Sequence, residues 1–336
     1  MLQWARQRNH VLPLTVAVGG TWMALTIAHQ LHWLMAVVVL LATMFLVYLE
    51  LLTQWSFRAP TKRKPALELT GWKRLDITVE GYRLAHYLKA GEPNKPVAWL
   101  CHGWTSGAIR MVDRAKPFVE RGWNVVLWDL PSHGASDRLS KWSAEQTTTL
   151  MIQSMNWLAN DRPAWFANGV CYYGHSIGGF IGLRTSRRRS ELNSDVNILG
   201  WVFESPMTGY TEIHAETCNL LRIPHRLRPW VLAKTIRHFN AINSAVGGVS
   251  SLSDADMPAW GVPRESTLLV QASPDNRLGE RHHERLTQIM EKPEHVGLLT
   301  AHYLSDLSHS GSHMSPSRDA VLSAWLDECL IHSSSV

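Results

Sequence analysis

Two long stretches without a charged residue lie near the start of this 336-residue chain. Residues 11–28 and residues 31–49 contain no Asp, Glu, Lys or Arg, and each run is long enough to cross a bilayer as a helix. A single helix over both runs would be about twice as long as the hydrocarbon core is thick. We therefore predict two transmembrane helices, at about residues 11–28 and 31–50, joined by a tight turn around residues 29–32.

The charges that flank these runs predict the orientation of the chain. Basic residues precede the first run and follow the second, namely Arg6, Arg8, Arg58, Lys62, Arg63 and Lys64. Because positively charged flanks stay in the cytoplasm, we expect a multi-pass protein of the bacterial inner membrane with both ends in the cytoplasm. A secretory signal peptide is the alternative for the first run, and its cleavage would place the rest of the chain on the opposite side. Helices buried in a soluble fold are a second alternative.

A GxSxG pentapeptide, from Gly174 to Gly178, follows the apolar, strand-like residues 169–173. A serine on a sharp turn between a strand and a helix needs neighbours without side chains, so that the backbone can bend and the hydroxyl can project. A helix-like run from Phe180 continues the pattern. We interpret Ser176 as a candidate nucleophile, and a glycine-rich turn with an incidental serine is the alternative.

Two further motifs lie upstream, and each follows a buried strand pattern. Residues 96–101 lead into a His-Gly loop at 102–107, and residues 124–128 lead into a turn at 129–137. Acyl transfer develops negative charge on a carbonyl oxygen, and two backbone N–H groups aimed at that oxygen stabilise it. The expected oxyanion donors are the N–H groups of Trp104, which follows Gly103 in the loop, and of Ile177.

The three motifs occur in the order in which the α/β-hydrolase superfamily carries them, and the chain resembles that superfamily over about residues 73–332. The resemblance implies an α/β fold, with a mostly parallel central sheet, helices on both faces and a helical cap. Ser132 stands where the family most often has a glycine. Asp129 and His133 are expected to shape the rim of the pocket, and His102 is expected to be structural, so none of the three is a candidate catalytic residue.

In this superfamily the nucleophile is followed along the chain by an acid and then by a histidine. The expected acid is Asp275, which follows the strand-like residues 267–271. Glu204, at the end of the strand-like residues 198–203, is the alternative acid, because some members supply it from that earlier strand.

The expected base is His309, in the loop after the strand-like residues 296–304. His313 is the alternative base, because the glycine two residues ahead of it resembles another common form of the final loop in this superfamily. Metal ligation by this histidine pair is disfavoured, since the Ser-Gly-rich segment lacks a helical pattern.

The chain divides into a membrane anchor at residues 1–57, a basic linker at 58–72 and a catalytic domain at 73–334, with a cap insertion at about 206–262. The insertion mixes apolar and basic residues, which predicts amphipathic helices that line the site or simply pack on the sheet. One α/β domain is supported by a predicted hairpin at 75–79 and 82–88 and by predicted helices at 111–121, 143–160, 179–189 and 279–290.

We expect a membrane-anchored serine hydrolase that cleaves a carboxylic ester with an apolar acyl chain, from a small molecule or a lipid, through an acyl-enzyme. Acyl transfer, thioester cleavage and serine peptidase activity use the same machinery, and a non-catalytic membrane scaffold is the alternative of another class. We expect no cofactor, because the serine mechanism needs none, and no metal site. A net charge of +5 without a recognition motif argues against nucleic-acid binding. The sequence does not indicate an oligomeric state.

Overall fold

A computed structural model describes residues 11–30, 32–244, 247–311 and 313–333. Arg6, Arg8 and Leu31, which the predicted orientation and turn involve, lie outside the described residues. The chain forms two compact units. The first contains the described parts of Met1–Ala59, Leu139–Ser143 and Thr211–Leu252, and the second contains Pro60–Arg138, Ala144–Tyr210 and the described parts of Ser253–Val336.

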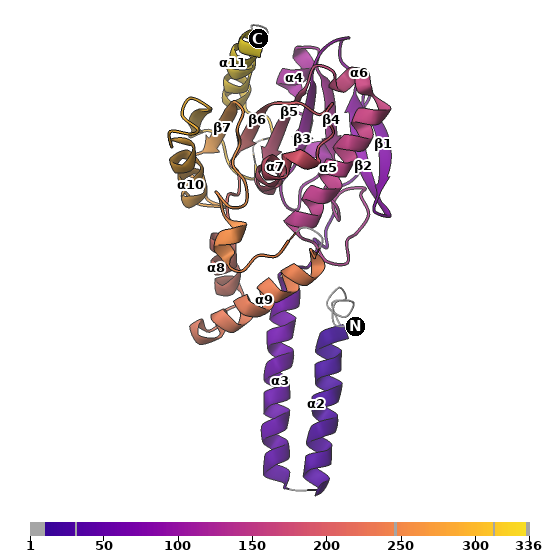
Figure 1. The fold of residues 1–336 in the computed structure, drawn as a ribbon, viewed down its shortest axis with the longest axis vertical. Helices are drawn as coiled ribbons and strands as arrows, with labels where there is room; N and C mark the ends of the chain where they lie inside the picture. The colour runs from indigo at the N-terminus through magenta and orange to yellow at the C-terminus, as the bar shows by residue number, and fades with distance from the viewer. Residues whose placement is uncertain (1–10, 31, 245–246, 312, 334–336) are drawn as a thin grey trace. The chain divides into compact units, whose positions relative to one another are not determined.

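The second unit is built on a sheet in the order β1-β2-β4-β3-β5-β6-β7-β8 (Figure 1). Strands β1 and β2 form an antiparallel hairpin, β2 pairs antiparallel with β4, and all later pairings are parallel. The strands are β1 Lys73–Val79, β2 Tyr82–Lys89, β3 Val97–Cys101, β4 Asn124–Trp128, β5 Val170–His175, β6 Ile198–Glu204, β7 Thr267–Ala272 and β8 Leu299–Leu304.

Helices cover both faces of this sheet, which explains why β3 and β4 are buried at every position and, apart from Asn124, apolar. Helices α4 and α11 contribute Phe118, Leu322 and Trp325 to a core shared with Ala98 and Leu100 of β3. Helices α5 and α7 lie on the opposite face (Figure 1). The helices of this unit are α4 Lys116–Glu120, α5 Ala144–Asp161, α6 Pro163–Phe166, α7 Ile177–Arg187, α10 Arg281–Met290 and α11 Pro316–Ser333.

The structure differs from two of the predicted elements. The helix expected over residues 111–121 is a short 3-10 turn, Ala108–Met111, followed by the five-residue α4. Pro117 lies in the first turn of α4, and because proline lacks an N–H and restricts the residue before it, a continuous helix is broken there. The last strand begins at Leu299, after Gly297 adopts a positive φ of 82°, and is therefore shorter than predicted.

The first unit contains α2 Val11–Gln30 and α3 Trp33–Trp55, both long and apolar enough to cross a membrane. The two helices pack closely at Gly20, where there is no room for a side chain. A Cβ placed at Gly20 would lie 2.1 Å from Oγ1 of Thr43. The unit also contains α8 Thr211–Leu220 and α9 Arg228–Ile242 from the predicted insertion. Their apolar side chains Cys218, Ile223 and Val231 pack with Leu49 of α3.

Candidate active site

Ser176 lies at a sharp turn between β5 and α7. Its backbone has φ 55° and ψ −117°, a strained conformation that the surrounding packing must hold. The flanking glycines are required by close approach: a Cβ at Gly174 would lie 2.6 Å from the backbone of Gly178, and one at Gly178 would lie 2.3 Å from the carbonyl oxygen of Cys101. The GxSxG segment therefore has the geometry of a nucleophile elbow.

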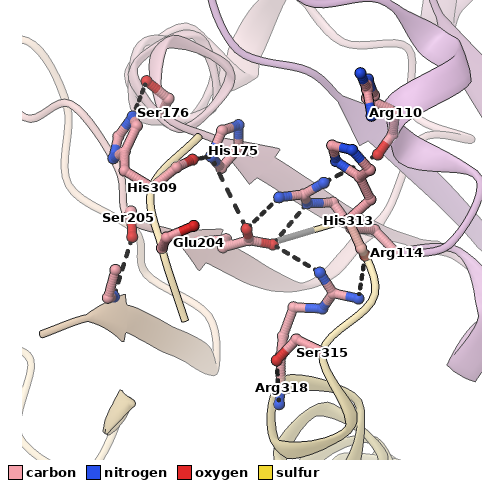
Figure 2. Close-up of polar contacts among 12 residues, drawn as sticks. Arg110, Arg114, His175, Ser176, Glu204, Ser205, His309, His313, Ser315 and Arg318 are labelled. Carbon is pink, nitrogen blue, oxygen red and sulfur yellow. Dashed lines mark hydrogen bonds and ion pairs between the residues drawn. The ribbon is translucent and has the colours of Figure 1, made fainter. Parts of the chain in front are cut away.

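The structure brings Ser176 together with His309 and Asp275. The His309 Nε2 atom lies 3.0 Å from Ser176 Oγ (Figure 2), and its Nδ1 atom lies 2.9 Å from Asp275 Oδ2. Because the carboxylate accepts from Nδ1–H, Nε2 is the acceptor for the serine hydroxyl proton. An imidazole held in this way can take that proton and so make the serine oxygen nucleophilic.

Asp275 lies in the loop after β7, and hydrogen bonds reach both of its carboxylate oxygens. The backbone N–H groups of Arg277 and Leu278 donate to Oδ1 at 2.9 Å, and Gln271 Nε2 donates to Oδ2 at 3.1 Å. Burial alone would raise the pKa of Asp275, but the hydrogen bonds from His309 and the backbone lower it to about 2. The carboxylate is therefore ionised at neutral pH and can stabilise a protonated His309.

The His-Gly loop passes beside the nucleophile. A Cβ at Gly103 would lie 2.8 Å from His175 Nδ1 and 3.2 Å from Ser176 Cβ, so the loop approaches this closely only because residue 103 lacks a side chain. Trp104 follows this glycine, and Ile177 is the first residue of α7. N–H groups in the first turn of a helix have no acceptor within the helix, which leaves the Ile177 N–H suited to an oxyanion.

Three polar residues of the upstream motifs hold loops. The Asp129 carboxylate accepts from the Tyr87 hydroxyl and from the N–H groups of Ala108 and Ala135. His102 Nε2 accepts from the backbone N–H of Leu130, and His133 Nε2 accepts from that of Thr105. Burial lowers the pKa of His102 to about 4 and, with His102 nearby, that of His133 to about 3, so both imidazoles are neutral at pH 7.

Glu204, the alternative acid, lies in a buried ionic cluster next to the elbow (Figure 2). Arg114 donates to both of its carboxylate oxygens, at 2.5 and 2.8 Å, the Tyr173 hydroxyl donates to one of them, and Arg318 Nη1 lies 3.8 Å away. Burial alone would raise the pKa of Glu204, but the adjacent Arg114 and the other cationic groups hold it well below its usual range. The Glu204 carboxylate is thus engaged here, and it is Asp275 that contacts His309 Nδ1.

His313, the alternative base, lies beside Arg110 and Arg114 (Figure 2). Its backbone carbonyl accepts from Arg318 Nη2 at 2.9 Å, whereas Ser176 Oγ is within hydrogen-bond distance of His309. Within the described ranges, no three His, Cys, Asp or Glu side chains converge as metal ligands would.

Sequence reasoning missed three members of this region. Arg114 and Arg318 are 4% and 0% exposed, and both form ion pairs with the buried carboxylate of Glu204. His175 donates from Nε2 to the backbone carbonyl of His309 at 2.9 Å. His175 occupies a variable position of the GxSxG motif, so the motif itself assigns it no role. An arginine in a helical pattern is usually exposed, so the sequence does not indicate that Arg114 and Arg318 are buried.

Among solved structures, an esterase of Pyrococcus furiosus aligns with a TM-score of 0.56 and 15% identity, covering 81% of this chain and 97% of that one. An α/β hydrolase from Vibrio vulnificus aligns with a TM-score of 0.52 and 19% identity, covering 78% and 81%. A membrane phospholipase A, described as a bacterial virulence factor, aligns with a TM-score of 0.51 and 16% identity, covering 77% and 87%. At these identities the likeness shows the fold alone, and it confirms the α/β-hydrolase fold predicted from the sequence.

Family membership comes from the sequence comparison. A search of curated proteins found no match. A family model described as serine aminopeptidase, S33 matches residues 92–316, which is more than half of the chain and includes Ser176, Asp275 and His309. The chain therefore belongs to the family described as serine aminopeptidase, S33, and is a hydrolase of the α/β-hydrolase type.

Proposed function

We propose that the protein is a membrane-anchored serine hydrolase that cleaves carboxylic esters with an apolar acyl chain. The observation that carries the proposal is the contact of His309 Nε2 with Ser176 Oγ at 3.0 Å, together with the contact of His309 Nδ1 with Asp275 at 2.9 Å. The structural likeness to an esterase and to a membrane phospholipase A supports an ester substrate. The two apolar helices α2 and α3 support delivery of that substrate from a bilayer.

The mechanism follows from these contacts. Ser176 Oγ attacks the ester carbonyl while His309 Nε2 takes its proton, and Asp275 stabilises the imidazolium that forms. The N–H groups of Trp104 and Ile177 stabilise the oxyanion. His309 then returns the proton to the leaving alcohol, and water activated by the same imidazole releases the acid from the acyl-enzyme.

A fluorophosphonate probe tests the activated serine in the detergent-solubilised full chain. The native chain is expected to be labelled, and Ser176→Ala and His309→Ala to lose labelling and at least about 1,000-fold of esterase turnover, since loss of one member of such a triad removes most of the rate. His313→Ala is the matched control and should keep near-native turnover. Absence of labelling in folded native protein would support a scaffold, and loss of turnover in His313→Ala alone would identify His313 as the base.

The family description makes peptide cleavage the second candidate function. Aminoacyl p-nitroanilides and p-nitrophenyl esters of increasing acyl length separate the two reactions on the same preparation. Faster turnover of long-chain esters is expected, and a preference for aminoacyl anilides would overturn the ester assignment. Addition of an acyl acceptor alcohol or a thioester distinguishes acyltransferase and thioesterase activity.

We further propose that the second compact unit, here called the hydrolase unit, faces the cytoplasm of a bacterium, because basic residues follow the second apolar run. A C-terminal alkaline phosphatase fusion, which is active only outside the cytoplasm, is expected to stay inactive. A fusion to a reporter that works in the cytoplasm is the matched control. Phosphatase activity would reverse the orientation.

A further inference from the structure

The insertion that the sequence predicts as a cap is attached to the end of α3. Leu49 of α3 packs with Cys218, Ile223 and Val231 of the insertion. Next to Leu49, the Glu50 carboxylate forms an ion pair with Lys234 of α9. Since Glu50 is the first charged residue after the apolar run of α3, these contacts hold α9 at the level where the run ends (Figure 1).

A second set of contacts secures the same end of α3. The Phe57 ring packs on His238 of α9 with ring centroids 4.8 Å apart, and Lys141 donates to Gln54 near the end of α3. The Ser143 hydroxyl donates to Asn243, which directly follows α9. The last turns of α3 therefore pack against one face of α9, at Val231, Lys234 and His238.

The insertion is strongly basic beyond its first helix. From Cys218 to Leu252 the chain has no Asp or Glu, and it has five basic residues, Arg222, Arg226, Arg228, Lys234 and Arg237. Lys234 is neutralised by Glu50, while the Arg237 guanidinium donates to the backbone carbonyl of Ala233, which carries no charge to neutralise it. The segment therefore carries uncompensated positive charge next to a candidate membrane span.

One face of α9 is exposed and combines aromatic, small and basic side chains. Trp230, Ala233 and Arg237 are exposed at spacings of three and four residues, which puts them on one stripe of the helix, and the exposed Arg226 precedes the stripe. Trp230 is 64% exposed, whereas Val231, one position along, is buried against the α3 contact. Leu220, at the end of α8, is 79% exposed.

We propose that the insertion is a membrane-interface platform, and that the α9 stripe of Trp230, Ala233 and Arg237, with Arg226, lies among the headgroups of anionic phospholipids. The proposal rests on the membrane anchor of the proposed function. An amphipathic helix in the bilayer interface places a tryptophan ring at the headgroup boundary and its basic side chains on lipid phosphates. The ion pair and the apolar contacts with α3 hold α9 at that depth before any lipid binds.

The basic linker that precedes the hydrolase unit is tied to that unit through one of its arginines. Arg63, in the middle of the basic cluster at residues 62–64, donates to the backbone carbonyls of Ser132 and Ser136. Its guanidinium therefore fastens the linker to the turn after β4.

Spin labels measure the depth of α9 in the full chain. Ala233→Cys is labelled in a Cys329→Ser background and reconstituted into nanodiscs of phosphatidylcholine with or without phosphatidylglycerol, and label collisions with oxygen and with a water-soluble nickel chelate are compared. Val38→Cys on the exposed face of α3 and Glu120→Cys on the exposed face of α4 are the membrane and water references. The Ala233 label is expected to lie between the two references in oxygen-to-nickel ratio, and deeper with phosphatidylglycerol.

Charge variants then test the role of the two arginines. Arg226→Gln with Arg237→Gln is expected to abolish the dependence of the Ala233 label on phosphatidylglycerol, while Lys116→Gln with Arg264→Gln, an equal charge change at exposed sites of the hydrolase unit, leaves it intact. If the Ala233 label matches the Glu120 reference while the Val38 label remains in lipid, the platform is wrong and the anchor stands. If the Val38 label is itself in water, the membrane anchor of the proposed function fails instead.

Discussion

His175 joins the nucleophile elbow to the loop that carries the candidate base. It precedes Ser176 in the chain, and its Nε2–H donates to the backbone carbonyl of His309 at 2.9 Å. Burial, with the positive charge of Arg114 nearby, lowers the pKa of His175 to about 3, so the ring is neutral and keeps one N–H to donate. We therefore infer that His175 is a positioning residue, which acts through the backbone of His309.

Substitution of His175 tests this role at the scale of one hydrogen bond. His175→Met removes the donor and is expected to lower kcat about tenfold with little change in KM, since the lost bond is worth on the order of 1 kcal/mol and misplaces the imidazole. His175→Gln keeps an N–H donor of similar reach and is expected to retain most of kcat. Steady-state kinetics and the pH dependence of kcat on a p-nitrophenyl ester provide the measurement, with circular dichroism as the folding control. Equal kcat in the two variants would remove the hydrogen bond from the account.

The strands were predictable because their environment leaves a simple pattern. A parallel strand buried on both faces needs apolar residues at consecutive positions, and residues 97–101 and 125–128 have them. Helix boundaries depend on single residues whose effect is easily missed, as Pro117 and Gly297 show. An apolar helix face predicts that the face is buried but does not predict which element covers it. Within its own unit, α9 packs against the end of α3.

The candidate site was predictable to the extent that it follows strand ends. Ser176, Asp275 and His309 come after three different parallel strands, and the carboxyl ends of such strands meet at one edge of the sheet. Their catalytic roles stay predictions. Arg114 and Arg318 lie outside the strands and hold Glu204 through contacts distant in sequence, so periodicity and motif order could not have found them.

The two compact units differ in the side chains that they expose and bury. Helices α2 and α3 expose apolar side chains such as Leu25, Val38 and Leu41 on their own unit. The hydrolase unit closes around its own core, and inside it lie imidazoles at His86, His102, His133 and His175, all at most 9% exposed. Because the four histidines whose pKa is lowered to about 3 or 4 all belong to the hydrolase unit, acid should destabilise that unit.

Acidification below pH 6.5 is therefore expected to destabilise the hydrolase unit. Burial lowers the pKa of His86 and His102 to about 4 and, together with nearby charged groups, that of His133 and His175 to about 3, against 6.5 in an unfolded chain. Below pH 6.5 these histidines bind protons in the unfolded state but not in the folded state. The free energy of unfolding therefore decreases as pH falls toward 4. At pH 5 each histidine can cost up to about 2 kcal/mol.

Urea unfolding of the detergent-solubilised full chain, followed by near-UV circular dichroism at pH 7 and pH 5, measures this loss. His86 lies in β2, and its Nδ1 contacts the carbonyl of Leu84 at 3.1 Å. His86→Asn keeps a donor at that position without a titratable ring, and its unfolding midpoint should fall less between the two pH values than that of the native chain. Tyr82→Phe, at the start of the same strand, controls for a generic change in β2 and should keep the native dependence. A native midpoint that is the same at pH 5 and pH 7 would show that these imidazoles gain a proton in the folded state as readily as in the unfolded one.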